Sequence, residues 1–428
     1  MTECFTRERV PQPSGSLPKG RWTRIPSHAW PYRMNRTLWN EIGVNHIRDV
    51  VEHAHAYGRC DVNKDRTLYD WQPASCSLEP LTADGACGPR RLLGRQALFI
   101  GDSTTAQLFL SYVLSIGGRF GRNLYNTGTF VSLTATACNG TLRLSYERAD
   151  ALLWASGTMN GGVTGLGCPC LNGMMTHKPF VGRAKTADSV VLGVGQHFAR
   201  LIESTPPHYR HVSYAFFVQN LNKTLSAIAA ANPESTRIVV GASTPVPGCS
   251  KPGAFTAPTS AMTALSDEAG GAATNVNAVS WWHHARLNAM ARAVALETGA
   301  TFIDLTELSS SRADDAMGRF PVAGRFEDCV HYCMPGVVDT FSRLVHNALA
   351  ARTPAARLSS DEWSKVGRHT VEETAWLGQR GAGLHLEGLL ADHHQNKIIY
   401  ESDAWWAKVI MGTSNCSSLC PVVLQHKR

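Results

Sequence analysis

The stretch "RQALFIGDSTTAQLF", residues 95–109, places an apolar run directly before Gly-Asp-Ser and a helix-like run directly after it. Consecutive apolar residues, here 97–100, are typical of a strand that is buried on both faces of a parallel sheet. Ser103 therefore stands where a strand ends and a helix begins. Two interpretations fit that position: Ser103 is a catalytic nucleophile, or it is the N-cap of the helix.

The same pattern recurs along the chain. Short apolar runs that end in Gly, Ser, Thr or Asp occur at residues 96–103, 149–157, 189–198, 236–244 and 300–308. Helix-like segments, with apolar residues at intervals of three and four, lie between the later runs at 214–231 and 280–299. This alternation predicts an α/β fold with a parallel sheet, whose functional residues gather beyond the carboxyl ends of the strands.

The overall composition is that of an ordinary globular protein. Of the 428 residues, 43% are hydrophobic and 18% are charged, and no segment is of low complexity or periodic. The formal net charge of +7 comes without a long run of Lys or Arg. We therefore expect neither a solenoid nor a nucleic-acid partner.

Twelve cysteines are scattered along the chain, at positions 4, 60, 76, 87, 138, 168, 170, 249, 329, 333, 416 and 420. Their even number and their scatter favour structural disulfides over one metal cluster. N-glycosylation sequons point to the same kind of compartment and start at Asn35, Asn139, Asn222 and Asn415. We therefore expect the secretory pathway, either the Golgi lumen or the extracellular space.

The first residues do not look like a targeting signal. The segment "MTECFTRERVPQPSG" lacks the apolar centre of a signal peptide, and no run of about 18 apolar residues that would span a membrane occurs in the sequence. We therefore expect neither a leader nor a membrane anchor in this chain. Two explanations stay open: the printed start omits a leader, or the cysteines are reduced.

A second segment, "FEDCVHYCMPGVVDTFSRLVHNAL" (326–349), supplies the groups that a nucleophilic serine needs. A serine hydroxyl requires a base, commonly a histidine that a carboxylate holds in the correct tautomer. Asp328 and His331 stand three residues apart, a spacing that brings both side chains to one side of a helical turn. We predict that Ser103 is the nucleophile, His331 the general base and then acid, and Asp328 its orienter.

Other roles for these residues stay open. Cys329, His331 and Cys333 are a possible zinc site, although three ligands so close together are unusual. We favour disulfides from the two cysteines to separate partners, which would clamp the loop that carries the histidine, and we expect no metal. Asp102 either caps the helix or holds the turn, and we give it no chemical role.

These motifs resemble those of a known family. Gly-Asp-Ser after a strand, together with residues 326–349, is similar to the pattern of the PC-esterase branch of the GDSL or SGNH hydrolases and acyltransferases. That branch includes the trichome-birefringence-like polysaccharide O-acetyltransferases. "YDWQPASCSLEPL" (69–81) is similar to their W-Q-P-x-x-C-x-L stretch, and "DSVVLGVGQHFAR" (188–200) to the strand that reads N-x-G-H-W in plants and L-G-Q-H-F in animal relatives. The resemblance implies an SGNH-type three-layer α/β/α sandwich.

The resemblance also implies an oxyanion hole and substrate contacts. Family members use the N–H of the nucleophile, a Gly and an Asn; the Asn position aligns with Gly193, so Gln196 or His197 would replace its side chain. We therefore expect oxyanion donors at Ser103, Gly193 and Gln196, with a further N–H near Gly157 or Gly161, and substrate contacts at Trp71 and His197. Packing at the strand end is an equally good explanation. The family's Arg-Asn after Gly-Asp-Ser is replaced by Ala106 and Gln107, which points to a different acceptor or donor.

We expect one catalytic body with appendages. Residues 1–88 would form an N-terminal lobe that disulfides link to the catalytic domain, 89–355, and residues 356–428 a C-terminal extension of unknown role. No linker rich in Pro, Gly or Ser separates the lobe from the domain. Aromatic residues of the lobe would line an acceptor cleft: Trp22, Trp30, Trp39 and Trp71.

The predicted function is O-acyl transfer, with an acetyl group passing through acyl-Ser103 to a hydroxyl of a glycan or polysaccharide. Two alternatives stay open: an acetyl esterase of the same family that deacetylates carbohydrate, and a catalytically silent relative that binds glycans. We expect no cofactor, because the acyl donor is a co-substrate. The expected partners are a glycan acceptor and an acetyl donor.

Overall fold

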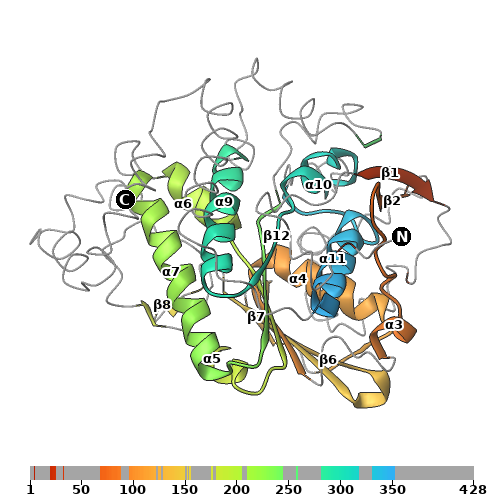
Figure 1. Cartoon of the computed structure of the whole chain (residues 1–428), viewed down its shortest axis with the longest axis horizontal. Coiled ribbons are helices and arrows are strands. Elements are labelled where there is room, and N and C mark those ends of the chain that lie inside the picture. Colours follow the sequence, from red (N-terminus) through yellow and green to blue (C-terminus); the bar gives the residue numbers. More distant parts are fainter. Residues whose placement is uncertain are drawn as a thin grey trace, which may run out of the picture.

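A mixed β-sheet with helices on both faces forms the centre of the computed structural model (Figure 1). The structure describes residues 4, 20–25, 32, 68–87, 96–121, 124–126, 129–149, 152, 154–155, 175–176, 180–204, 210–243, 257–258, 281–317 and 330–351. Within them the sheet has the order β12-β11-β10-β3-β7-β6-β4, and β5 pairs with β6. The strands are β3 Gln96–Gly101, β4 Arg119–Phe120, β5 Leu124–Asn126, β6 Thr129–Ala137, β7 Leu142–Arg148, β10 Ser189–Gly193, β11 Thr236–Val240 and β12 Thr301–Ile303.

The parallel part of the sheet has the order of a doubly wound fold. β12, β11, β10, β3 and β7 run parallel, and their order along the chain gives the spatial pattern 2-1-3-4-5. The direction of winding switches between β3 and β10, where ligands of such folds commonly bind. The predicted α/β sandwich with a parallel sheet is confirmed. The antiparallel strands β6, β4 and β5 extend it at one edge.

Helices cover each face of this sheet (Figure 1). One side has α4 Ser103–Ser115, α10 Thr306–Ser310 and α11 Val337–Ala351, and the other has α5 Phe180–Ala184, α6 Gln196–Ser204, α7 Arg210–Ala231 and α9 Trp281–Glu297. The predicted helices at 214–231 and 280–299 are confirmed as α7 and α9, with α7 starting four residues earlier.

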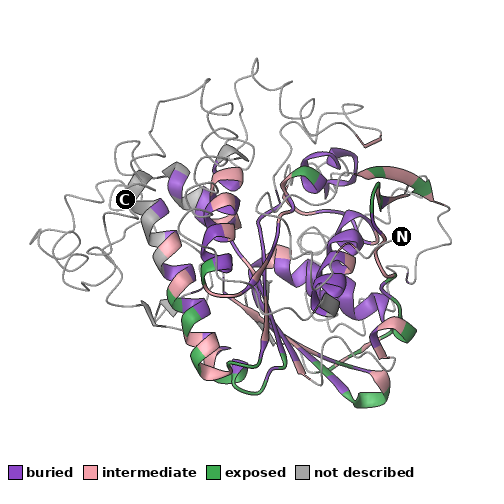
Figure 2. Cartoon of the chain, in the orientation of Figure 1, coloured by how far each residue is buried: buried purple, intermediate pink, exposed green. Residues whose placement is uncertain are grey.

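Burial on both faces explains the unbroken apolar run of β3. Ala97 and Phe99 belong to the core beneath α4 and α11, whereas Leu98 and Ile100 belong to the core beneath α7 and α9. All four side chains are almost completely buried. The central strands therefore carry buried residues along their whole length, as Figure 2 shows, while exposed residues appear on the outer side of α7.

The described residues of the run predicted as a strand, 149–157, do not belong to the main parallel sheet. The neighbour of β3 on that side is β7, which precedes this run. Within 149–157 the described residues contribute only the two-residue strand β8, Trp154–Ala155, which pairs with β9, Met175–Thr176, outside the main sheet. β7 alternates buried and more exposed residues, so it reads as a half-buried strand rather than as a continuous apolar run.

The N-terminal lobe contains an antiparallel pair of strands, β1 Gly20–Ile25 and β2 Leu68–Pro73, which we call the N-terminal ribbon. Arg343 of α11 holds the ribbon: its guanidinium lies 2.9 Å from an Asp70 carboxylate oxygen and donates to the Trp71 carbonyl oxygen at 2.6 Å. The ribbon is thus fastened to the helix layer of the catalytic body.

Disulfides make the attachment of the lobe covalent. Cys4 is bonded to Cys76 within the lobe, and Cys87 at the end of α3, Ala83–Cys87, is bonded to Cys138 after β6. The predicted disulfide-linked lobe is therefore confirmed. The predicted C-terminal extension, 356–428, lies outside the described residues. In the part of the chain that the structure describes, no helix combines the length and apolarity needed to cross a bilayer.

Asp339 is a buried carboxylate that joins the lobe, α4 and α11. It accepts hydrogen bonds from Tyr32 Oη at 2.6 Å, Ser111 Oγ at 2.7 Å and the Gly336 backbone N–H at 2.6 Å. Burial raises its pKa from 3.8 to about 6, although these hydrogen bonds act in the opposite direction. The folded state therefore retains a proton on Asp339 at pH values where the unfolded chain has released it.

We predict that this proton makes stability depend on pH. As pH rises from about 4 to about 6, Asp339 should lower the free energy of unfolding by about 3 kcal/mol, at about 1.4 kcal/mol per pKa unit. Asp339→Asn should remove this dependence, because an amide does not titrate in this pH range. The fold should be kept, because the amide oxygen still accepts from Gly336 N–H and the two hydroxyls can turn to accept from the amide nitrogen. Urea unfolding of both proteins between pH 4 and 7 measures the difference. Parallel stability curves would contradict the prediction.

Candidate active site

The turn between β3 and α4 places Ser103 at the start of a helix. Asp102 Oδ1 accepts hydrogen bonds from Thr104 N at 2.9 Å and from Thr104 Oγ1 at 2.7 Å, so Asp102 is the N-cap of α4. Ser103 is the first residue inside the helix, and its side chain is partly exposed. The interpretation of Ser103 as the helix cap is therefore wrong. The interpretation of Asp102 as a capping residue is confirmed.

A tyrosine of β7 also fixes this turn, through hydrogen bonds to the backbone of the turn. The hydroxyl of Tyr146 lies 2.8 Å from the Asp102 carbonyl oxygen and 3.1 Å from that of Gly101, and it donates to these backbone acceptors. Tyr146 is completely buried. No sequence motif pointed to Tyr146, whose signal was an aromatic residue at a buried position of an alternating strand.

Ser103 and His331 meet across the fold. His331 Nε2 lies 2.7 Å from Ser103 Oγ, although 228 residues separate them in sequence. This distance allows the ring nitrogen to take the hydroxyl proton directly. In that arrangement the proton of the neutral ring is on Nδ1, which calls for an acceptor such as a carboxylate. The predicted acceptor, Asp328, lies outside the described residues, so its role stays a prediction.

Backbone hydrogen bonds hold the segment that carries His331. Met317 N donates to the His331 carbonyl oxygen at 2.9 Å, and Cys333 N donates to the Asp315 carbonyl oxygen at 2.9 Å. Between them, Tyr332 forms an isolated antiparallel bridge with Ala316. The histidine is thus mounted on a short strand-like segment with a hydrogen bond at each end.

The zinc interpretation does not fit this segment. Cys333 is disulfide-bonded, so it has no thiolate to offer a metal, and His331 Nε2 is directed at Ser103. Cys329 lies outside the described residues, and so the predicted pairing of the two cysteines with separate partners stays untested. Among the residues that the structure describes, no group of three or more His, Cys, Asp or Glu side chains is arranged to hold a metal.

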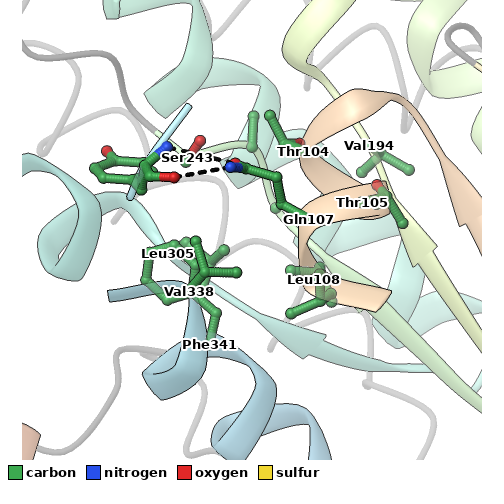
Figure 3. Close-up of a pocket in the computed structure, with 14 residues that line it drawn as sticks. Thr104, Thr105, Gln107, Leu108, Val194, Ser243, Leu305, Val338 and Phe341 are labelled. Atoms are coloured by element: carbon green, nitrogen blue, oxygen red, sulfur yellow. Dashed lines mark hydrogen bonds between the residues drawn. The ribbon is translucent and has the colours of Figure 1, made fainter. Parts of the chain in front are cut away.

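Gln107 connects the nucleophile helix to the histidine segment. Its Nε2 donates to the Tyr332 carbonyl oxygen at 2.8 Å, and its Oε1 accepts from Tyr332 N at 3.4 Å. Figure 3 shows these bonds beside a small pocket. The sequence showed Gln107 only as a departure from the family pattern. In the structure its side-chain amide bonds both backbone groups of Tyr332, as a neighbouring strand would do. Tyr332 is the residue next to His331.

The pocket in Figure 3 lies beneath the first turn of α4 and has a volume of about 30 Å³. It is lined by the ends of β10 and β11, by α4 and by apolar side chains of α11: Thr104, Thr105, Gln107, Leu108, Gly193, Val194, Val240, Gly241, Ala242, Ser243, Leu305, Tyr332, Val338 and Phe341. A pocket of this size can hold ordered water.

Thr105 decides what position 193 can hold. A Cβ built on Gly193 would lie 1.9 Å from Thr105 Oγ1, and one built on Gly101 would lie 2.2 Å from the same oxygen. As packed, Thr105 leaves no space for a side chain at Gly193, and at Gly101 the Gly193 carbonyl oxygen, 2.7 Å from the same Cβ, excludes one as well. Gly193, which aligns with the Asn that the resemblance implies, thus has only backbone groups to offer.

The other predicted donors lie at the start of α6. Gln196 is the first residue of that helix, and its Oε1 is buried without a hydrogen-bond partner. His197 follows it and is half-buried. Gly157 and Gly161 lie outside the described residues. The oxyanion roles of Ser103, Gly193 and Gln196, and the substrate contact of His197, stay predictions.

Trp71 is placed differently from the expectation. Its side chain is only 6% exposed and packs edge-to-face on Trp22, with ring centroids 5.3 Å apart. It belongs to the core that includes α4 and α11. As placed, the ring has almost no surface for a sugar, which corrects the predicted substrate contact. Two further tryptophans of the predicted cleft, Trp30 and Trp39, lie outside the described residues.

Comparison with known proteins gives a match that spans the sheet and its helices. A family model described as PC-Esterase, a GDSL/SGNH-like acyl-esterase family found in Pmr5 and Cas1p, matches residues 90–348, which include Ser103 and His331. No curated protein matches the chain. Among solved structures, one of a peptidoglycan O-acetylesterase in action is similar over 62% of this chain and 92% of its own, with 12% identity and a TM-score of 0.35. At that TM-score the likeness carries no weight of its own.

We predict that Gln107→Glu slows the chemistry at Ser103. An ionised carboxylate cannot donate to the Tyr332 carbonyl oxygen, and a buried hydrogen bond lost in this way costs about 1–3 kcal/mol, or roughly 5-fold to 150-fold in rate. The measurement is the rate at which a fluorophosphonate labels Ser103.

Gln72→Glu is the matched control. Gln72 is exposed and its Oε1 only accepts a hydrogen bond, from Thr23 Oγ1 at 3.1 Å, so a carboxylate can replace it. Its labelling rate should equal that of the wild type. Equal rates for both variants would show that Gln107 does not hold the histidine segment.

Proposed function

Because the chain belongs to the PC-esterase family, a GDSL/SGNH-like family of acyl-esterases, we propose that it moves an acetyl group through an acyl-Ser103 intermediate. Family membership supports acyl-ester chemistry at the level of hydrolysis or transfer. The observation that carries the proposal is the distance of 2.7 Å between His331 Nε2 and Ser103 Oγ. Ser103 lies at the carboxyl edge of the sheet, beside the switch point, where α/β folds place their reacting groups.

The first half of the reaction acylates the serine. As Ser103 Oγ attacks the acetyl carbonyl carbon, His331 Nε2 takes the hydroxyl proton, and the carbonyl oxygen becomes an oxyanion. His331 then returns the proton to the leaving alkoxide as the donor C–O bond breaks. Because Ser103 is the first residue of α4, the positive end of the helix dipole stabilises negative charge that develops there.

The second half releases the acetyl group. A hydroxyl loses its proton to His331 Nε2 and attacks the acyl-Ser103 carbonyl carbon, and His331 then protonates the departing Ser103 Oγ. We assign Asp328 the task of orienting His331 through Nδ1. We assign oxyanion donors to the Ser103 and Gly193 backbones and to Gln196, and a substrate contact to His197. No step calls for a cofactor.

We infer that the attacking hydroxyl belongs to a glycan or polysaccharide. Support comes from the resemblance of residues 69–81 and 326–349 to motifs of polysaccharide O-acetyltransferases. The N-terminal ribbon contacts the end of α10 and α11, and we infer that it is the element that a transferase adds. The acetyl donor is a co-substrate, and nucleic acid has no part in the reaction.

We also propose a location in the secretory pathway, in the Golgi lumen or outside the cell. The disulfides Cys4–Cys76 and Cys87–Cys138 and the disulfide-bonded state of Cys333 support an oxidising compartment. One sequon residue, Asn139, is exposed in the turn after β6, as glycosylation requires.

The acetyl esterase is the second candidate. The family's description as acyl-esterases favours it, and the same acyl-Ser103 serves both reactions. A silent glycan-binding relative is less well supported, because binding alone does not require the hydrogen bond between Ser103 and His331.

We predict that Ser103→Ala abolishes acetyl release from nitrophenyl acetate and abolishes the acetyl adduct seen by intact-mass measurement, with the fold retained. His331→Ala should cost nearly as much. Asp328→Asn should be milder, with a loss of about 10³ to 10⁴ in rate because the base is misoriented. Circular dichroism checks the fold of each variant. Activity that survives Ser103→Ala would refute the proposed nucleophile.

We predict that transfer exceeds hydrolysis when the correct glycan is present. Water is present at about 55 M, so a transferase must hold a sugar hydroxyl in line with the acyl carbonyl, where effective molarities of about 10⁵ M are attainable. With an acetyl donor and a panel of neutral and acidic glycans, acetylated sugar should exceed free acetate by NMR. If the acyl-enzyme forms and every glycan yields only acetate, the esterase is the correct assignment.

A further inference from the structure

We propose that Arg312 is a positioning residue for His331, and that the N-terminal ribbon acts on the active site through this arginine. The inference rests on the proposed function, in which His331 is the general base. Nothing in the sequence analysis assigned a role to Arg312, which lies in the short segment between α10 and the described part of the histidine segment.

Arg312 is a buried charge with carboxylate partners. Its side chain is 0% exposed; its Nε donates to Asp314 Oδ1 at 2.9 Å, and its Nη2 lies 3.3 Å from Asp314 Oδ2 and 3.6 Å from Asp315 Oδ2. Burial acts to lower the pKa of Arg312, but the carboxylates of Asp315 and Asp314 together raise it above its ordinary value. The arginine therefore stays charged and holds both carboxylates.

The N-terminal ribbon covers this charge with aromatic faces. The guanidinium carbon lies 4.6 Å from the ring centroid of Trp22, on β1, and 5.3 Å from that of Tyr69, on β2. Trp22 Nε1 also donates to Ser311 Oγ at 2.9 Å. Arg312 Nη1 is buried without a hydrogen-bond acceptor, so the aromatic rings are the neighbours that stabilise this part of the cation. A planar guanidinium suits such stacking, whereas a lysine ammonium does not.

Arg312 reaches the histidine segment through Asp315. The Asp315 carboxylate accepts a hydrogen bond from Val337 N at 2.6 Å, at the first residue of α11, and its carbonyl oxygen accepts from Cys333 N at 2.9 Å. Two residues later, Met317 N donates to the His331 carbonyl oxygen at 2.9 Å. One short segment thus holds His331 on one side and the start of α11 on the other.

The space around Asp315 leaves little freedom for adjustment. A Cβ on Gly336 would lie 2.1 Å from Asp315 Oδ2, so the carboxylate packs directly against the backbone that leads from the histidine segment into α11. When Arg312 or its aromatic cover changes, Asp314 and Asp315 lose the cation that fixes their direction. The backbone that they support then shifts, and His331 shifts with it. A displacement of about 1 Å at a reacting group is enough to cost about 10²-fold in rate.

The test compares full-length variants that change either Arg312 itself or Trp22, which covers it. Arg312→Lys keeps the charge and loses the planar stack, Trp22→Leu removes a ring face, and Trp22→Phe keeps a ring while losing the hydrogen bond to Ser311. The matched control is Gln72→Met, which removes an exposed hydrogen bond of the same ribbon, from Thr23 Oγ1, without touching residues 312–317 or the contacts that fasten the ribbon to α11. The readouts are kcat and KM for nitrophenyl acetate, and the NMR signal of the His331 ring, assigned with His331→Ala.

The expected result is a split between the variants. Arg312→Lys should lower kcat about 10²-fold and Trp22→Leu about 10-fold, with KM nearly unchanged, because the base moves while substrate binding stays. Trp22→Phe should restore most of kcat. The His331 signal should move in the first two variants, and Gln72→Met should leave both kcat and the signal as in the wild type. If Arg312→Lys does not fold, the two Trp22 variants and the control decide.

Other results would overturn the inference. Wild-type kcat and an unmoved His331 signal in Trp22→Leu would do so, as would an equal loss of kcat in Gln72→Met, which would mean that any change in the ribbon affects the site. A wild-type protein without esterase activity, in which the His331 signal still moves in Trp22→Leu but not in Gln72→Met, would contradict the proposed function and leave the positioning intact.

Discussion

The hydrogen bond between Ser103 and His331 requires two distant parts of the chain to meet within 2.7 Å at one edge of the sheet. Each side chain is brought to this distance by the backbone around it, which other residues hold in place. Asp102 and Tyr146 fix the turn that presents the serine, and residues 315–317 fix the backbone of the histidine. Gln107 then joins the two sides directly through the backbone of Tyr332. These hydrogen bonds hold the two sides of the contact in place.

Helix α4, which begins at Ser103, and helix α11, which follows the histidine segment, also share polar contacts within their packed faces. Ser342 Oγ of α11 donates to the Leu108 carbonyl oxygen and lies 2.9 Å from Ser111 Oγ of α4. Further along, Tyr112 Oη lies 2.9 Å from His346 Nδ1, and burial lowers the pKa of that histidine to about 4, so the ring is neutral at pH 7. Apolar packing alone tolerates sliding between helices, whereas paired polar groups fix their register. A fixed register between α4 and α11 keeps the serine, at the start of α4, at a constant distance from the histidine, in the segment that leads into α11.

The sequence predicted the parts of the site whose signal is local. Gly-Asp-Ser after an apolar strand marked Ser103, and the spacing within 326–349 marked His331. The strand β7 was misplaced, because a half-buried strand alternates and carries polar residues such as Arg143 and Ser145. Gln107 was not found as a positioning residue, because its partner is a backbone group 225 residues away. Arg312 resembles any surface arginine in "SSSRADDA", and only the fold shows that aromatic rings from the N-terminal ribbon cover it. Trp71 was expected to line a cleft, because the sequence alone does not distinguish a tryptophan that stacks on a sugar from one that packs in the core. Its burial depends on pairing with the partner strand β1.

The tight contact of Thr105 with Gly193 makes two positions a single choice. A chain with threonine at 105 in this packing must have glycine at 193, because the hydroxyl oxygen occupies the space of the missing side chain, whereas glycine at 101 is also required by the Gly193 carbonyl oxygen, 2.7 Å from where a Cβ would lie. An asparagine at 193 is therefore accessible only after residue 105 has become smaller, and in the reverse direction the threonine can appear only after the asparagine has gone. Neither single exchange keeps the packing, so the step between the two arrangements passes through an intermediate sequence with a small residue at 105 and glycine at 193. Threonine at 105 and a side-chain donor at 193 are in this sense mutually exclusive solutions for the same corner of the fold.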